Sequence, residues 1–540
     1  MEDDTLAQPA YTALFVFGDS LSDNGAVFAL TEGALPPTEL IGIDLDGNPV
    51  DFTERGIFYN GRYTNGDVYA DVAAHALGIP GDTSTFYDDF SGSNLAIGGA
   101  TASDLTAIGD SSTNTFANQV STFQGAIASL PGTDASKQAF LSGAAASVFI
   151  GLNDLGAIGG ASTATGVIDQ AVISTGVAAI LEQLFAQTQV IADSGVGTII
   201  LNKLPGGSFF PNANPLIDAF GPGTAELFDQ VSAQVNAGIE SLATTLQASG
   251  TSVEIVDFFG LAKEIQNDQE TFGFLTLENA LPDSNNSTTL LIDDVPINQI
   301  GFIDPVHFTA ELHEVFDVFQ AMTIGNAQID GGASGGITSG SAANETIFAK
   351  EGRDRVRAED GDDLIFAGAD NDVVFAGEGA DIVFGGTGND VLIGEAGKDI
   401  LSGGDGRDIL LGEADDDVIA GNAGNDFVNG GAGDDVLTDG LGSDVVFGGS
   451  GDDIVIYRAA STLGGTDGAD EDVFFGGSGA DTLLIISDTA IADIDAFLLA
   501  NNVELFDFET VTSITSDELE TYDFGAVGTL VETADLFGLI

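Results

Sequence analysis

Short apolar runs alternate with longer amphipathic stretches through the first 325 residues. Four runs have the length and the β-branched or aromatic bias of buried strands, and these are residues 13–17, 146–150, 197–201 and 252–258. Apolar residues at helical spacing predict helices near residues 67–77, 173–194, 224–249 and 310–322. Such alternation is typical of βαβ units, so the pattern predicts an α/β domain built on a parallel sheet.

The pattern then changes to a strict nine-residue period. Residues 326–344, which separate the two patterns, are rich in Gly, Ser, Ala and Thr and have the composition of a flexible linker. Beyond them an aspartate recurs at every ninth position, and an apolar residue stands two positions after each one. The unbroken run is Asp354, Asp363, Asp372, Asp381, Asp390, Asp399, Asp408, Asp417, Asp426, Asp435, Asp444 and Asp453, and the phase resumes at Asp472 and Asp481. A disordered acidic tail would not need this apolar period, so we expect a folded second half.

The chain is strongly acidic, with 85 Asp and Glu against 12 Lys and Arg and a formal net charge of −73. The excess is present in both halves, because residues 1–325 alone carry 40 acidic and 5 basic residues. This charge argues against nucleic acids and anionic membrane surfaces as partners and favours cations. For the first half, a surface adapted to high salt is an equally simple explanation.

The sequence holds no cysteine, which excludes disulfides, thiol catalysis and thiolate metal sites. A bound metal must therefore have oxygen ligands. The opening residues Met1-Glu2-Asp3-Asp4 have neither the basic nor the apolar region of a Sec-type signal peptide, and no run of about 18 apolar residues suggests a transmembrane segment. Export would need another signal.

Ser20 lies in the turn Gly18-Asp19-Ser20-Leu21 that follows the first predicted strand. Gly18 lets the strand turn sharply, and the carboxyl edge of a parallel sheet is where ligands bind. Ser20 is therefore a candidate nucleophile. The alternative is a structural serine that caps a helix.

Two later turns hold candidate donors for an oxyanion. Gly99 ends a short apolar run, and its backbone N–H could approach a ligand closely. Asn153 follows the second predicted strand, where its side-chain amide could donate to the same oxyanion. The alternatives are a plain tight turn at Gly99 and a turn-capping role for Asn153.

Asp304 precedes His307 by three residues, just ahead of the helix predicted over 310–322. At that spacing Asp304 can hold one imidazole nitrogen and leave the other free to accept a proton from a serine. Of the three histidines, only His307 has such a partner, since His75 and His313 lie within predicted helices as ordinary residues.

In this order, the Ser20 turn, Gly99, Gly151-Leu152-Asn153-Asp154 and Asp304-Pro305-Val306-His307 resemble the GDSL or SGNH hydrolases, over roughly residues 10–322. The resemblance implies a flavodoxin-like, three-layer α/β/α fold and a lipase or esterase that hydrolyses carboxylic esters through an acyl-enzyme. It implies Ser20 as nucleophile, His307 as general base and Asp304 as its orienting partner. The oxyanion hole would consist of the Ser20 N–H, the Gly99 N–H and the Asn153 amide.

The nonapeptides resemble the G-G-x-G-x-D-x-U-x repeat of the RTX family, which binds calcium in a parallel β-roll. The resemblance implies an all-β parallel roll with Ca²⁺ as a structural cofactor. Two nonapeptides make one coil, so alternate aspartates should stack in two columns on opposite sides. The expected metal ligands are Asp363, Asp372, Asp381, Asp390, Asp399, Asp408, Asp417, Asp426, Asp435, Asp444 and Asp453. Stacked carboxylates repel one another, so the roll should close only with calcium.

Residues 486–540 return to apolar and acidic segments and resemble the C-terminal secretion region of type I exported RTX proteins. The expected domains are a catalytic domain over 1–325, a linker over 326–344, a roll over 345–485 and this region. The chain should be extracellular, with an ester or lipid substrate, calcium and type I secretion machinery as partners.

Two other functions remain open at this stage. The same site could serve a phospholipase or a deacetylase of acylated sugars, because the loops that line the pocket cannot be interpreted. A protein of another class, a calcium-stabilised surface or matrix protein, would carry an idle hydrolase domain, although the complete residue set counts against it.

Overall fold

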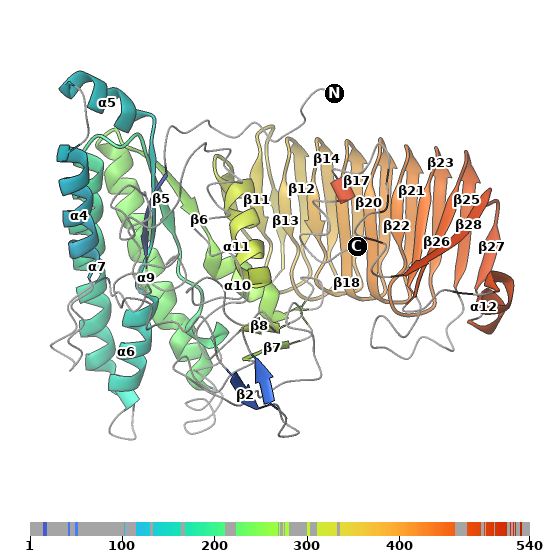
Figure 1. The fold of residues 1–540 in the computed structure, drawn as a ribbon, viewed down its shortest axis with the longest axis horizontal. Coiled ribbons are helices and arrows are strands. Elements are labelled where there is room, and N and C mark those ends of the chain that lie inside the picture. Colours follow the sequence, from blue (N-terminus) through green and yellow to red (C-terminus); the bar gives the residue numbers. More distant parts are fainter. Residues whose placement is uncertain are drawn as a thin grey trace. The chain divides into compact units, whose positions relative to one another are not determined.

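The computed structural model divides the chain into two compact units, residues 1–266 with 274–325 and residues 267–273 with 326–540 (Figure 1). We describe each unit by itself. The residues that the structure describes are 14–18, 41–43, 49–51, 102, 115–129, 133–163, 168–210, 223–267, 269, 274, 276–279, 300–302, 310–331, 335–458, 472–487, 491, 493–501, 503–515, 519, 522, 524 and 530–531. The helix expected near 67–77 lies outside them.

The first unit is built on a four-stranded parallel sheet in the order β1-β4-β5-β6. The strands are β1 (Leu14–Gly18), β4 (Ala145–Phe149), β5 (Thr198–Asn202) and β6 (Ser252–Val256). All four predicted strands are confirmed within one or two residues at each end. Two small pairs accompany the sheet, antiparallel β2 (Ile41–Ile43) with β3 (Pro49–Asp51) and parallel β7 (Thr276–Asn279) with β8 (Ile300–Phe302).

Helices cover both faces of this sheet (Figure 1). Phe17 of β1 packs against Phe116 and Phe123 on one face, whereas Phe149 of β4 packs against Phe258 on the other. The helices are α4 (Phe116–Ser129), α5 (Asp134–Ser142), α6 (Leu152–Thr163), α7 (Gln170–Asp193), α9 (Gly223–Ala248), α10 (Phe258–Asn267) and α11 (Ala310–Thr323), with a 3₁₀ turn η2 (Gly207–Phe209). The expected α/β fold with a parallel sheet is confirmed.

Helices α7, α9 and α11 were predicted, whereas α4, α5, α6 and α10 were not. Asp169 caps α7 by accepting hydrogen bonds from the backbone N–H groups of Ala171 and Val172. Among the described residues, α7 is the one helix long and apolar enough to cross a membrane. It packs against α4, α6 and α9 inside the first unit and buries residues such as Ile180 and Leu184 there.

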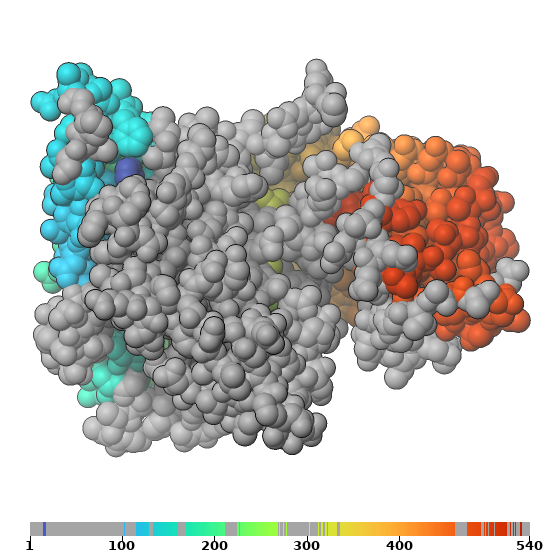
Figure 2. Space-filling view, viewed as in Figure 1, coloured from blue at the N-terminus to red at the C-terminus, as the bar shows by residue number. Residues whose placement is uncertain are grey.

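The second unit is a stack of short strands in two parallel sheets, which confirms the expected all-β parallel roll. One sheet contains β10 (Ile337–Ser339), β12 (Arg355–Asp360), β14 (Val373–Glu378), β17 (Val391–Ala396), β19 (Ile409–Ala414), β21 (Phe427–Ala432), β23 (Val445–Ser450), β25 (Val473–Ser478) and β27 (Glu504–Phe506). The other contains β9 (Ala327–Asp330), β11 (Glu345–Phe348), β13 (Leu364–Phe366), β15 (Ile382–Phe384), β18 (Ile400–Gly406), β20 (Val418–Gly424), β22 (Val436–Thr438), β24 (Ile454–Arg458), β26 (Thr482–Ser487) and β28 (Thr510–Thr515), with β16 (Thr387–Gly388) beside β18. In the space-filling view of Figure 2, the visible surface of this unit changes from orange to red along the sequence.

The apolar residue of each nonapeptide forms the core of this roll. The residues two positions after the periodic aspartates are fully buried: Val356, Ile365, Val374, Val383, Leu392, Leu401, Leu410, Ile419, Val428, Leu437, Val446, Val455, Phe474 and Leu483. Strands pair with those 18 residues later, for example Val374 with Leu392. The nine-residue period therefore sets both the core and the strand register.

The roll extends beyond the expected range of 345–485 in both directions. Residues 326–344 are not simply a linker, because β9 pairs with β11 and β10 pairs with β12 in the same 18-residue register. At the other end, β27 and β28 add a further turn and α12 (Ile494–Ala500) packs on the end of the core through Leu498. These residues form strands because pairing with a neighbouring strand satisfies their backbone N–H and C=O groups. Their composition alone does not predict that pairing.

Candidate active site and candidate calcium columns

The carboxyl ends of β1 and β4 lie side by side in the sheet of the first unit. Gly18, the last residue of β1, pairs with Phe149, the last residue of β4. The chain therefore leaves both strands at one edge, toward Ser20 after β1 and toward Asn153 after β4. Ser20 itself lies outside the described residues, so its predicted role as nucleophile is not tested.

Asn153 belongs to the first turn of α6 and is half-buried. The sequence pattern suggested an irregular turn here, but the helix starts three residues after β4 ends. Next to it, Asp154 is fully buried and its Oδ2 accepts a hydrogen bond from the backbone N–H of Ala102 at 2.6 Å. This bond holds Ala102 beside the start of α6, and Gly99, three positions earlier in the sequence, lies outside the described residues.

Asp304 and His307 also lie outside the described residues, but the elements on either side of them are described. Strand β8 ends at Phe302, two residues before Asp304, and α11 begins at Ala310, three residues after His307. These flanking elements have fixed positions in the core of the unit.

A chain of aromatic contacts connects both flanking elements to the carboxyl end of β4. Phe316 of α11 lies 4.9 Å from Phe258 between ring centroids, and Phe258 lies 5.0 Å from Phe149. Phe209 completes the chain, with centroid distances of 6.0 Å to Phe316 and 5.5 Å to Phe302. Phe302 and Phe316, which lie on either side of Asp304 and His307 in the sequence, therefore belong to one aromatic cluster that reaches the end of β4.

Buried polar groups at the end of β5 have partners and hold the sheet edge together. Asn202 donates from Nδ2 to Ser147 Oγ at 2.9 Å, and Lys203 forms ion pairs with Asp257 at 3.0 Å and Glu240 at 2.9 Å. Burial alone would lower the pKa of Lys203, but the two carboxylates outweigh it and raise the pKa above its ordinary value. We assign Lys203 a structural role, because its charge is already neutralised.

The periodic aspartates of the second unit form the two columns expected from the sequence. In each column, Oδ1 of one aspartate accepts a hydrogen bond from the backbone N–H of the aspartate 18 residues earlier, at 2.7–3.0 Å over the unbroken run. One column joins Asp354, Asp372, Asp390, Asp408, Asp426, Asp444 and Asp472, and the other joins Asp363, Asp381, Asp399, Asp417, Asp435, Asp453 and Asp481.

The second carboxylate oxygen in these columns is available to a cation. Oδ2 is buried and has no hydrogen-bond partner within the described part of the chain in Asp363, Asp372, Asp381, Asp390, Asp399, Asp417, Asp426, Asp435, Asp453 and Asp481. Burial raises the pKa of Asp381 to about 8 and that of Asp417 to about 9. A buried carboxylate without a partner is costly unless a positive charge is bound, so these oxygen-only sites fit Ca²⁺.

In eight repeats, a glycine five positions before the aspartate leaves room for the aspartate Oδ2. A Cβ added at the glycine five positions before the aspartate would meet Oδ2 in eight repeats, at Gly385, Gly394, Gly403, Gly412, Gly421, Gly430, Gly448 and Gly476. The first glycine of the nonapeptide is therefore required by close approach to the carboxylate as well as by turn geometry.

Glutamates continue one column at both ends, and the sequence pattern did not reveal them. The N–H of Glu345 donates to Asp363 Oδ1 at 2.7 Å, and the N–H of Asp481 donates to Glu509 Oε2 at 3.0 Å. Glu345 precedes Asp363 by 18 residues, and Glu509 follows Asp481 by 28. A search for any carboxylate at these spacings, rather than for aspartate at nine, would have found both.

Comparison with known protein families gives matches to both units. The family described as GDSL-like Lipase/Acylhydrolase matches residues 14–316. The RTX calcium-binding nonapeptide repeat (4 copies) matches residues 339–374, 375–410, 402–437, 430–459 and 466–483. No curated protein gave a significant match to the chain.

Proposed function

Because the chain belongs to the GDSL-like lipase/acylhydrolase family, we propose that it hydrolyses carboxylic esters through an acyl-enzyme formed on Ser20. The observation that carries the proposal is the convergence at one edge of the sheet. Gly18 and Phe149 pair there, Ala102 is bound to Asp154, and the aromatic cluster anchors β8 and α11 beneath the same edge. Each of the four predicted motifs therefore lies, in the sequence, within a few residues of a described element that ends or begins at this edge or in this cluster.

In the proposed reaction, His307 accepts the proton of Ser20 as the hydroxyl attacks the ester carbonyl, and Asp304 orients the imidazole. The N–H groups of Ser20 and Gly99 and the amide of Asn153 stabilise the oxyanion of the tetrahedral intermediate. His307 then gives the proton to the leaving alcohol. Water attacks the acyl-enzyme with His307 again as base, which releases the acid and regenerates Ser20.

The second unit carries RTX calcium-binding repeats, and we propose that calcium on the two aspartate columns stabilises the roll. Each column aligns buried carboxylates that repel one another without a cation. We further propose a catalytic domain over residues 1–325 and export of the chain by type I secretion machinery, with residues 486–540 contributing the signal. Folding of the roll would then follow arrival in an extracellular, calcium-rich environment.

Two alternatives differ from this proposal in the substrates that the chain would cleave. A phospholipase or a carbohydrate deacetylase would use the same nucleophile but prefer phospholipids or acetylated sugars. A surface protein with an idle hydrolase domain would cleave none of these substrates.

The experiment compares hydrolysis of p-nitrophenyl esters of increasing acyl length, in millimolar calcium, by the native chain, Ser20→Ala and Ser22→Ala. Ser22 is a matched control, because it is a serine two residues away in the sequence. We expect hydrolysis to be lost in Ser20→Ala and retained in Ser22→Ala, and the acyl-length profile then separates esterase from lipase. Activity only on phospholipids or acetylated sugars would favour the first alternatives, and no activity on any ester would favour the idle domain.

A further inference from the structure

Asp439 breaks the repeat pattern at a position that glycine occupies elsewhere. It stands five residues before Asp444, where eight other repeats have the glycine that leaves space for the aspartate Oδ2. It directly follows β22, whereas Asp444 directly precedes β23 and Asp472 directly precedes β25. Asp439 is therefore not a member of either aspartate column.

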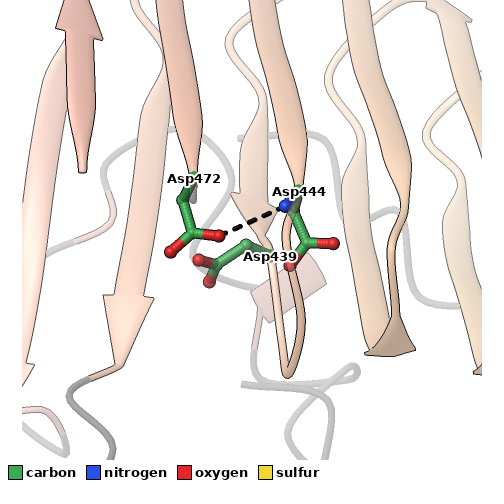
Figure 3. A group of neighbouring side chains, drawn as sticks. All are labelled: Asp439, Asp444 and Asp472. Carbon is green, nitrogen blue, oxygen red and sulfur yellow. Dashed lines mark hydrogen bonds between the residues drawn. The ribbon is translucent and has the colours of Figure 1, made fainter. Parts of the chain in front are cut away.

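The carboxyl group of Asp439 lies in the interior of the roll beside two column aspartates. One carboxylate oxygen from each of Asp439, Asp444 and Asp472 lies within 4.8 Å of the other two, and all three residues are buried. Figure 3 shows the side chain of Asp439 between those of Asp444 and Asp472. Asp439 is 1% exposed, and its Oδ1 has no hydrogen-bond partner among the described residues.

This geometry suits calcium. Ca²⁺ binds oxygen ligands at about 2.3–2.6 Å, so oxygens as far as about 4.8 Å apart can share one ion. Three buried carboxylates whose oxygens lie within 4.8 Å of one another repel strongly when they are ionised. A divalent cation would remove that repulsion and satisfy the unpartnered oxygen.

The cluster lies where the period of the roll is interrupted. Asp444 and Asp472 are column neighbours 28 residues apart instead of 18, because ten residues are inserted between successive repeats. The column hydrogen bond from Asp444 N–H to Asp472 Oδ1 is 3.2 Å, against 2.7–2.8 Å in the preceding turns of this column. The bond between the Asp444 N–H and the Asp472 carboxylate is therefore the longest of its column, and it lies where the three carboxylates meet.

We propose that Asp439 adds a third carboxylate to the column site of Asp444 and Asp472, so that this site binds Ca²⁺ more tightly than the other column sites and braces the roll across its interruption. Calcium affinity increases with the number of charged ligands, and this site has one more carboxylate than a pair of column neighbours provides. The ion would join Asp439 and Asp444, before the insertion, to Asp472, after it.

The test measures calcium binding to the full-length chain by competition with a chromophoric chelator, for native protein, Asp439→Asn and Asp439→Gly. Asp439→Asn keeps the shape and removes one charge, whereas Asp439→Gly restores the residue found in the other repeats. The matched control is Asp415→Gly, which removes an exposed aspartate at another glycine position, where φ is 77°. We expect one calcium ion in the native chain and in Asp415→Gly to bind more tightly than the rest, and its affinity to fall by about tenfold or more in both Asp439 variants.

A second measurement, hydrogen exchange at limiting calcium, reports on the brace. Strand β25 should exchange faster in Asp439→Asn than in the native chain, while β14 should be unchanged. If Asp439→Asn binds calcium with the native affinities, this site is wrong, although calcium on the columns is still supported. If the native chain binds no calcium at all, both this inference and the proposed role of the columns are wrong.

Discussion

The rings of Phe149 and Phe258 lie 5.0 Å apart between centroids, at the carboxyl end of β4. Through Phe258 the strand end that leads to Asn153 is packed against α11, the helix that follows His307. Two segments that are about 150 residues apart in the sequence therefore share one buried cluster. The proposed active site depends on this cluster for its geometry.

Replacement of Phe258 should weaken both the first unit and its activity. Phe258 is fully buried and contacts Phe149, Phe316 and Phe319. We expect Phe258→Ala to lower the free energy of unfolding by about 3–5 kcal/mol, measured by denaturant unfolding, and to lower kcat because α11 loses its anchor. Phe258→Leu should recover most of the loss. The control is Phe140→Ala at a residue 37% exposed, and an equal loss of stability in both alanine variants would contradict the proposed anchoring.

Asp154 should act as a positioning residue for the segment that carries Gly99. Its Oδ2 accepts from the Ala102 N–H in a fully buried environment. Asp154→Ala leaves that N–H unsatisfied, which should cost about 1–3 kcal/mol of stability and lower kcat more than it changes KM. Asp134→Asn, at an exposed residue of α5, is the control. A KM effect without a kcat effect would show that Asp154 serves substrate binding instead.

Removal of calcium should affect the two units differently. We expect chelation at pH 8 to unfold the roll, measured by loss of β-sheet circular dichroism, while ester hydrolysis by the first unit persists at least in part. At calcium ten times above its dissociation constant, each site contributes about 1.4 kcal/mol. Asp417→Asn should therefore lower the stability of the calcium-bound roll by about that amount, and Asp415→Asn, two residues away and exposed, should not.

The calcium-free roll should lose stability as the pH rises. Burial raises the pKa of Asp381 and Asp390 from 3.8 to about 8, so the folded state holds more protons than the unfolded chain between these values. The free energy of unfolding must then fall as pH increases from about 4 to about 8. Calcium competes with these protons, so its apparent affinity should instead increase over the same interval. Denaturant titrations with chelator present at pH 5 and pH 8 measure the first effect, and equal stability at both pH values would contradict the burial of these carboxylates.

The regular parts of the fold followed from the sequence because one residue type at one spacing determines them. An apolar residue two positions after each aspartate predicted the buried core that runs from Val356 to Leu483. The four strands of the first sheet were predicted for a similar reason, since buried parallel strands are nearly continuous apolar runs.

The features that the sequence did not reveal depend on contacts between distant residues. Strands β9 and β10 form because the neighbouring turn offers a partner, although their residues have the composition of a linker. Helix α6 starts directly after β4, so Asn153 lies in a helix rather than in a turn. The nine-residue period did not indicate a role for Asp439, because Asp439 stands at a glycine position of the repeat rather than at an aspartate position. Its proximity to Asp472 depends on the fold.

The most direct test of the proposed catalytic mechanism is to identify the residue that a fluorophosphonate ester modifies, by mass spectrometry of the intact chain and of its peptides. This reagent forms a stable adduct with a serine that an adjacent base has activated. We predict one adduct per chain, on Ser20, absent in Ser20→Ala and strongly slowed in His307→Ala but not in His313→Ala. Ester hydrolysis by the native chain with the adduct on another residue, or with no adduct at all, would contradict the assignment of Ser20 as the nucleophile.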